Sequence, residues 1–181
     1  MKKIILALLV LLTVGGFSAS AQKIGHLNYL ECLDTLQTYK TAIKKSEELE
    51  ANFKTTMTDL QKEYERLALE YEQNIGTWSD IIRQSKERAL QDLQLISESA
   101  QAEYQKNMEI VQTRYFTKME EWLKASVDIV GKRRALDYIL YFDEKSSIFW
   151  VNPDRGVDIT NEVITEILKQ ELANPVKEPG Q

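Results

Sequence analysis

The chain has 181 residues, of which 43% are hydrophobic and 28% charged, and its formal net charge at neutral pH is −5. This acidic balance argues against nucleic acid as a partner and against a basic, membrane-binding surface. The single cysteine, Cys32, and the single histidine, His26, exclude an intramolecular disulfide and a zinc site built from histidine and cysteine alone.

The N-terminus has the layout of a secretory signal peptide. Two lysines precede the apolar run Ile4 to Phe17, and Ala19-Ser20-Ala21 matches the small-residue cleavage pattern. A membrane anchor is the alternative, but the run is shorter than a spanning helix needs. We therefore expect residues 1–21 to be a cleaved signal peptide and the rest to be exported, without stable membrane insertion. Loss of the two lysines leaves 21 basic against 28 acidic side chains, a net charge of −7.

Residues 22–36 predict a short strand followed by a short helix. Apolar side chains fall on both faces of the segment Lys23 to Tyr29, which favours a strand. Three leucines then recur at every third position, as in a short helix packed on one side: Leu30, Leu33 and Leu36. On these elements we expect Cys32 to be a buried, inert thiol and His26 to be a structural residue rather than a ligand or a base.

Residues 37–134 predict a long helical arm. The segment contains no proline and only two glycines. A heptad seam with charged side chains between its members runs along the first half: Phe53, Met57, Leu60, Tyr64, Leu67 and Tyr71. The return half carries a second apolar series with the same spacing: Ala89, Leu93, Ile96 and Ala100.

Stop and start signals coincide between the two halves of the arm. Gly76 suits a left-handed helix end, and Thr77 with Asp80 resembles a capping box. The sequence therefore predicts an antiparallel hairpin with its tip near residues 76–80; one uninterrupted helix is the alternative. After Ala100 the apolar spacing approaches an 11-residue repeat, which unwinds a supercoil and points to flexibility near Tyr104 to Met108.

Residues 135–170 predict a second part of the body. Leu136 to Phe142 and Ile148 to Val151 are apolar runs on either side of a polar turn, which indicates a β-hairpin. Caps at Asp158 to Thr160 open a final helix with an apolar stripe, and residues 171–181 form a polar tail predicted to be disordered. The two body segments are too small to enclose a core of their own, so we expect them to be an oligomerisation body.

The sequence shows no catalytic constellation, so we expect no enzyme activity, no metal and no cofactor. Trp78 and Phe116 are off-seam aromatics that could contact a partner. Arg83, Lys86 and Arg88 form a small basic cluster past the tip that could meet an anionic partner; a solvated helix face is the alternative.

The chain resembles the Skp/OmpH family of periplasmic chaperones. The resemblance spans Lys23 to Lys169 and rests on Lys23 to Asn28, on Tyr39 to Ala42 and above all on Leu136 to Lys169. It implies a homotrimer whose small β body carries three helical hairpins around a cavity. It also implies that the cavity holds unfolded outer-membrane proteins in the periplasm without ATP. The acidic charge departs from the basic members of the family.

We therefore predict a mainly α protein in which a long helical hairpin projects from a small, short-stranded body. The predicted function is an ATP-independent holdase for unfolded outer-membrane proteins. A coiled-coil adaptor of the cell envelope that binds one folded partner is the alternative.

Overall fold

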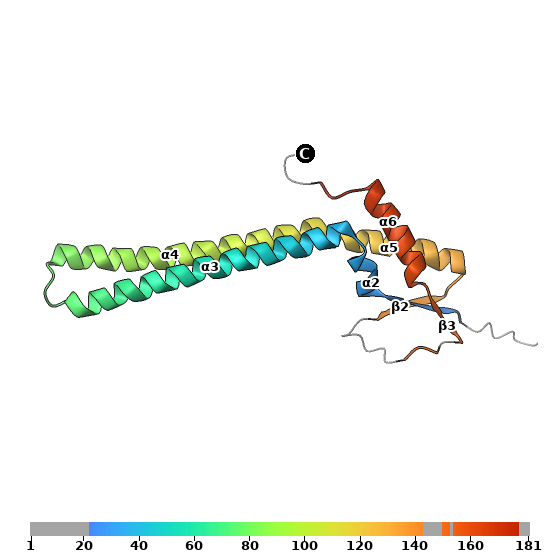
Figure 1. Ribbon diagram of the computed structural model, residues 1–181, viewed down its shortest axis with the longest axis horizontal. Helices are drawn as coiled ribbons and strands as arrows, with labels where there is room; N and C mark the ends of the chain where they lie inside the picture. Colours follow the sequence, from blue (N-terminus) through green and yellow to red (C-terminus); the bar gives the residue numbers. More distant parts are fainter. Residues whose placement is uncertain (1–21, 143–149, 153, 178–181) are drawn as a thin grey trace, which may run out of the picture.

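The structure is a computed structural model that describes residues 22–142, 150–152 and 154–177. The predicted signal peptide, residues 1–21, and the first two residues of the predicted strand Ile148 to Val151 lie outside them. Figure 1 shows two long helices side by side, with the remaining elements gathered at one end. In chain order the elements are β1 (Ile24–Asn28), α2 (Tyr29–Asp34), α3 (Gln37–Asn74), α4 (Asp80–Val111), η1 (Gln112–Phe116), α5 (Thr117–Arg134), β2 (Tyr138–Phe142), β3 (Gly156–Asp158) and α6 (Thr160–Ala173).

The predicted hairpin is confirmed, but its turn is closed differently. Helix α3 ends at Asn74 and α4 begins at Asp80. The carbonyl oxygen of Asn74 accepts from the backbone N–H groups of Thr77 and Trp78 and from the Thr77 hydroxyl, so Thr77 closes α3 rather than opening α4. The residue before α4 is Ser79, whose side chain makes no capping hydrogen bond. Gly76 is not left-handed, and nothing lies within 4 Å of the Cβ it would carry.

The sheet differs from the predicted β-hairpin. The described strands lie in the order β2-β1-β3, and both outer strands pair with β1 in parallel. Trp150 and Val151 are not in a strand; the third strand is Gly156–Asp158, which sequence analysis missed. The difference arises because β1 is the central strand. Strand β2 pairs with one edge of β1 and β3 pairs with the opposite edge, so β2 and β3 do not pair with each other.

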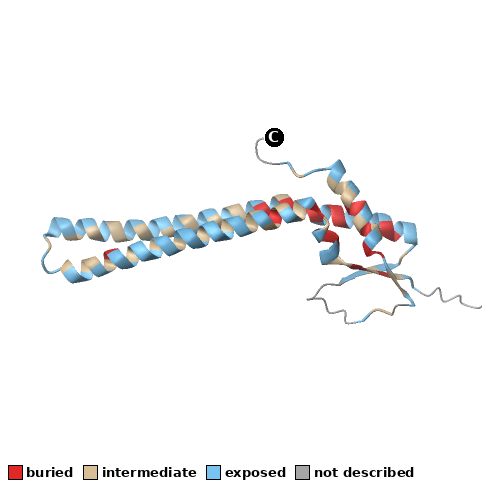
Figure 2. Ribbon diagram, viewed as in Figure 1, coloured by how far each residue is buried: buried red, intermediate tan, exposed pale blue. Residues whose placement is uncertain are grey.

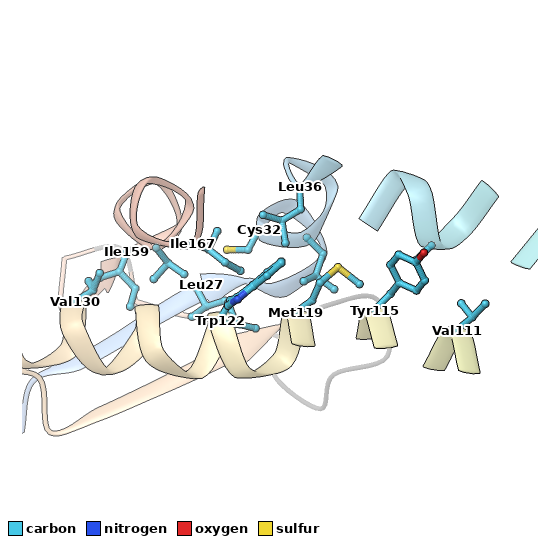
Figure 3. Packing of buried hydrophobic residues seen from close by; sticks show 14 residues of the cluster. Leu27, Cys32, Leu36, Val111, Tyr115, Met119, Trp122, Val130, Ile159 and Ile167 are labelled. Carbon is cyan, nitrogen blue, oxygen red and sulfur yellow. The ribbon is translucent and has the colours of Figure 1, made fainter. Parts of the chain in front are cut away.

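The core of the body is formed around α5 and α6. Figure 3 shows Trp122 and Met119 of α5 meeting Cys32, Leu36 and Ile167. These five residues are at most 3% exposed. The chain does enclose a core, against expectation, because α5, which sequence analysis assigned to the arm, supplies one side of it.

Cys32 is confirmed as a buried thiol. It is fully buried, and burial raises its pKa to about 12. Because the thiolate is the reactive form, this thiol is inert at neutral pH. In the same short helix Leu33 is buried as predicted, whereas Leu30 is 40% exposed.

A π-helical turn, η1, joins the arm to the body. Such a turn holds one more residue than an α-helical turn, so it rotates the following helix relative to the preceding one. The turn keeps Val111, Tyr115 and Met119, spaced four residues apart, on the buried side. The irregularity that the spacing predicted is therefore present, but at Gln112–Phe116 rather than at Tyr104 to Met108.

The last helix fixes the base of the arm. Residue Leu36 provides no side-chain cap for α3. Instead the carboxylate of Glu171, on α6, accepts from the backbone N–H of Thr38 at 2.7 Å and of Gln37 at 3.4 Å. Helix α6 continues to Ala173, and Val176 packs on the core. The predicted disordered tail thus begins inside a helix that holds the arm in place.

Candidate functional site: the helical arm

The arm formed by α3 and α4 buries very little of its own surface. Helix α3 has 38 residues, which gives a length of about 57 Å at 1.5 Å per residue. Its buried residues are Ala42 and Leu67, and in α4 only Val111 is buried. Figure 2 shows the contrast: buried residues concentrate at the body and the adjoining end of the arm. The arm therefore presents its apolar seam partly to solvent.

The seam predicted on α3 is confirmed, and the one predicted on α4 is wrong at one position. Leu67 is 5% exposed and the other α3 seam residues are half-buried. On α4, Leu93 and Ala100 are half-buried, but Ile96 is 51% exposed and Ser97 occupies the inward position. The inward series Leu93, Ser97, Ala100 and Tyr104 keeps a 4, 3, 4 spacing. Sequence analysis chose the apolar isoleucine over the serine beside it.

Two neighbouring hollows lie on the middle of the arm. One hollow of ≈ 570 Å³ is lined by Met57, Leu60, Gln61, Tyr64, Leu93, Gln94, Ser97 and Glu98. A second, of ≈ 680 Å³, is lined by Glu50, Phe53, Lys54, Met57, Thr58, Gln61, Lys62 and Tyr104. The two hollows share Met57 and Gln61 and are therefore neighbours along α3; together we call them the mid-arm groove. The rings of Phe53 and Tyr104, which both line the second hollow, stack on each other with centroids 4.4 Å apart.

The tip of the arm is held by contacts between its two helices. Lys86 forms an ion pair with Glu70 at 2.6 Å and lies over the Trp78 ring, 5.5 Å from its centroid. The Lys86 ammonium holds the pKa of the Glu70 carboxyl below its usual range. Trp78 also meets Tyr71 edge to face, and the Tyr71 hydroxyl donates to Glu87 at 2.5 Å. These contacts join the helix ends across the turn.

The five residues singled out as contacts do not form one site. Trp78 and Lys86 contact each other at the tip, and Arg83 pairs with Asp80 nearby. Arg88 is exposed two residues beyond Lys86. Phe116 lies at the opposite end of the arm, in η1, where its ring meets Tyr39 edge to face. The basic cluster is thus partly neutralised, by Asp80 on its own helix and by Glu70 on α3.

The residues that line the mid-arm groove were missed as a site. Gln61 and Ser97 are polar, and nothing in either helix alone distinguishes them from solvated positions. A seam position occupied by serine opposite large residues would have been the available signal.

The body carries a second uncovered apolar surface. Tyr138 is 56% exposed, Leu140 40% and Trp150 73%. Tyr138 and Leu140 alternate along β2, an edge strand, and so lie on one face of the sheet. On the other side of β2, Ile139 and Tyr141 line a hollow of ≈ 420 Å³ against α5. In the described sheet β2 is an edge strand, and an apolar face on an edge strand is a common site of association between chains.

The described part of the chain was also compared with the requirements of a metal site and of a membrane-spanning helix. Across residues 22–142, 150–152 and 154–177, no group of three or more histidine, cysteine or acidic side chains is placed to hold a metal ion. Within those same ranges no helix is both long and apolar enough to cross a membrane.

Comparison with known proteins supports the architecture. Residues 23–167 match the model of the family described as outer membrane protein (OmpH-like). No curated protein sequence matches the chain. The fold is similar to the crystal structure of an OmpH-like protein from Caulobacter crescentus CB15, provisionally classed as an outer membrane chaperone; the TM-score is 0.58 and the identity 12%, over 84% of this chain and 88% of that one. Because the family match covers most of the chain, this protein belongs to the OmpH-like family of outer membrane proteins.

Proposed function

We propose that this protein is a periplasmic, ATP-independent holdase that keeps unfolded outer-membrane proteins from aggregating. The observation that carries the proposal is the half-covered seam of the arm: apart from its root, the arm has one buried residue, Leu67. A compact domain buries its apolar surface, whereas this arm leaves a long apolar strip accessible. Many weak contacts along such a strip add up to firm capture through effective concentration, and they still permit release.

The proposal includes a homotrimer joined through the body. The open sheet face with Tyr138 and Leu140, together with exposed Trp150, supports association of the bodies while the arms stay free. Three arms around one space would enclose a client from several sides. No catalytic residue is assigned, because holding an unfolded chain requires binding and not bond chemistry.

The test is a light-scattering assay of an outer-membrane β-barrel protein diluted from urea. We expect the mature chain, from Gln22, to suppress the scattering at a ratio near one trimer per client. Native mass spectrometry should then show a trimer that takes up one unfolded chain. A chain that leaves the barrel to precipitate, yet binds a folded envelope protein, would instead support the adaptor function.

A further inference from the structure

We propose that His26 makes the association of the bodies sensitive to pH, so that the bodies join near neutral pH and separate in mild acid. The inference rests on the homotrimer of the proposed function and names a means of regulating it. It concerns the face of the sheet that is turned away from α5 and α6, which we call the open face. The only histidine of the chain lies on this face.

His26 occupies the middle of the central strand. On β1, Gly25 and Leu27 are buried toward the helices that cover one side of the sheet (Figure 1). Because side chains alternate along a strand, His26 points to the open face. Its neighbours in the strand pairing are Leu140 on β2 and Asp158 on β3. His26 therefore lies beside the apolar surface that we propose joins the bodies.

The imidazole ring packs closely against strand β3. His26 is half-buried, and its Nδ1 atom is shielded from solvent. A Cβ atom at Gly156 would lie 3.2 Å from the Cδ2 atom of the ring, so the glycine leaves the space that the ring uses. The backbone beside it is also fixed, because the His26 carbonyl accepts from the N–H of Ile159 at 2.9 Å. The ring thus has little room to move aside when the open face is covered.

Asp158 is the acidic residue paired with His26 across the sheet. Burial raises the pKa of its carboxyl, but hydrogen bonds from Thr160 and the charge of His26 outweigh burial and hold this pKa below its usual range. The carboxylate accepts from the N–H of Thr160 at 2.9 Å and from its hydroxyl at 2.6 Å. Because these two bonds already occupy it at the start of α6, Asp158 offsets a charge on His26 only in part.

The remaining charges around the open face lie at its ends. On β2 the residues of this face, Tyr138 and Leu140, carry no charge in mild acid. Among the described residues, two basic and two acidic side chains flank the strands at exposed positions: Lys23, Asp137, Asp154 and Arg155. Their charges cancel in number, and solvent and salt screen them. The charge of the open face therefore depends mainly on His26 and Asp158.

Assembly brings several copies of this histidine together. Three bodies joined through their open faces around a three-fold axis contribute three His26 side chains to one interior. Histidine normally gains its positive charge between about pH 8 and pH 5. Three charged rings would repel one another and would lose their hydration, whereas three neutral rings meet neither cost. The trimer therefore binds fewer protons than the separate chains, and its association constant should fall as the pH is lowered.

The first test measures assembly at two pH values. Sedimentation equilibrium of the mature chain, from Gln22, should give an association constant that is at least about tenfold lower at about pH 5.5 than at about pH 7.5, because each proton that must be released changes it tenfold per pH unit. His26→Gln keeps a polar side chain but cannot gain this charge, so its constant should change by less than about twofold. The matched control adds Ser99→His to His26→Gln. It restores one histidine at an exposed position on the arm and should not restore the pH dependence.

A second readout uses the unaltered protein and decides the case in which His26→Gln does not assemble. Because His26 is the only histidine, its ring signals in an NMR spectrum are unambiguous. By linkage, these signals should titrate at lower pH in concentrated protein, where the trimer prevails, than in dilute protein.

A titration that does not depend on protein concentration, or an association constant that does not change with pH, would overturn the inference and leave the homotrimer standing. If the wild type stays monomeric at about pH 7.5, the homotrimer and its regulation by His26 fall together. The scattering assay at that pH still judges the holdase function by itself.

Discussion

Around Trp122, side chains from β1, α2, α5 and α6 exclude solvent almost completely, whereas around Met57 two helices meet with their seam residues half-exposed. Both regions contain apolar residues at helical spacing, so periodicity does not distinguish them. The difference lies in the number of elements that meet. A core needs cover from several sides, and a lone pair of helices cannot supply it. The arm thus keeps accessible the kind of surface that the body hides.

The strongest test of this difference in packing removes an equal side-chain volume from each region and compares the losses of stability. Ile167→Ala, in the fully buried core of the body, should destabilise the protein by about 2–5 kcal/mol, because it leaves a cavity. Leu93→Ala, on the half-buried seam of α4, should cost only about 1 kcal/mol, since its side chain is already partly hydrated. Urea denaturation of both variants provides the measurement. Equal losses would mean that the arm is packed as tightly as the body.

The join between α5 and α6 should make the body sensitive to acid. Arg133 and then Lys169 lower the pKa of Glu166, and Arg134 lowers the pKa of Glu162. Carboxyls with lowered pKa values contribute stability that is fully present above their unfolded pKa and is lost as the pH falls through the folded one. The melting temperature should therefore decrease when the pH is lowered past about 4.5.

The control for that prediction is the double variant Glu162→Gln, Glu166→Gln. It should melt lower than the wild type at pH 7, and the gap should narrow toward pH 3 as the wild-type carboxyls become protonated. A gap that does not change with pH would assign the acid sensitivity to other carboxyls.

The cap at the root of the arm should have a smaller effect. Glu171→Ala removes the acceptor for the first N–H groups of α3, which should cost about 1 kcal/mol. Hydrogen exchange of the Gln37 and Thr38 amides should accelerate, while exchange near the tip stays unchanged. Glu171→Gln, which keeps an acceptor, should restore most of the protection. If exchange at Thr38 does not respond, the cap is not formed in solution.

Local patterns were sufficient to predict the hairpin, β1 and the buried thiol, because each depends on neighbours in sequence. The parallel sheet was not predictable, since Gly156–Asp158 is too short to stand out and its partner is more than 120 residues away. The Glu171 cap and the mid-arm groove were missed for the same reason. Both depend on how distant segments meet: Glu171 reaches the start of α3, and the first hollow lies where Leu93 and Ser97 face Leu60 and Tyr64.

The smallest expected effect concerns the tip, where Glu70 and Lys86 pair across the arm at 2.6 Å with both side chains about a third exposed. Exposed ion pairs contribute little, and salt screens them. Glu70→Gln and Lys86→Gln, alone and together, should each move the melting temperature by less than about 2 °C, and the coupling should vanish in 1 M salt. Lys86→Gln also removes the cation over the Trp78 ring. The tryptophan fluorescence emission of this variant should therefore shift, whereas that of Glu70→Gln should not. A large coupling between Glu70 and Lys86 that persists in 1 M salt would mean that the tip is a packed unit, like the body. The arm would then consist of a fixed tip and an open middle.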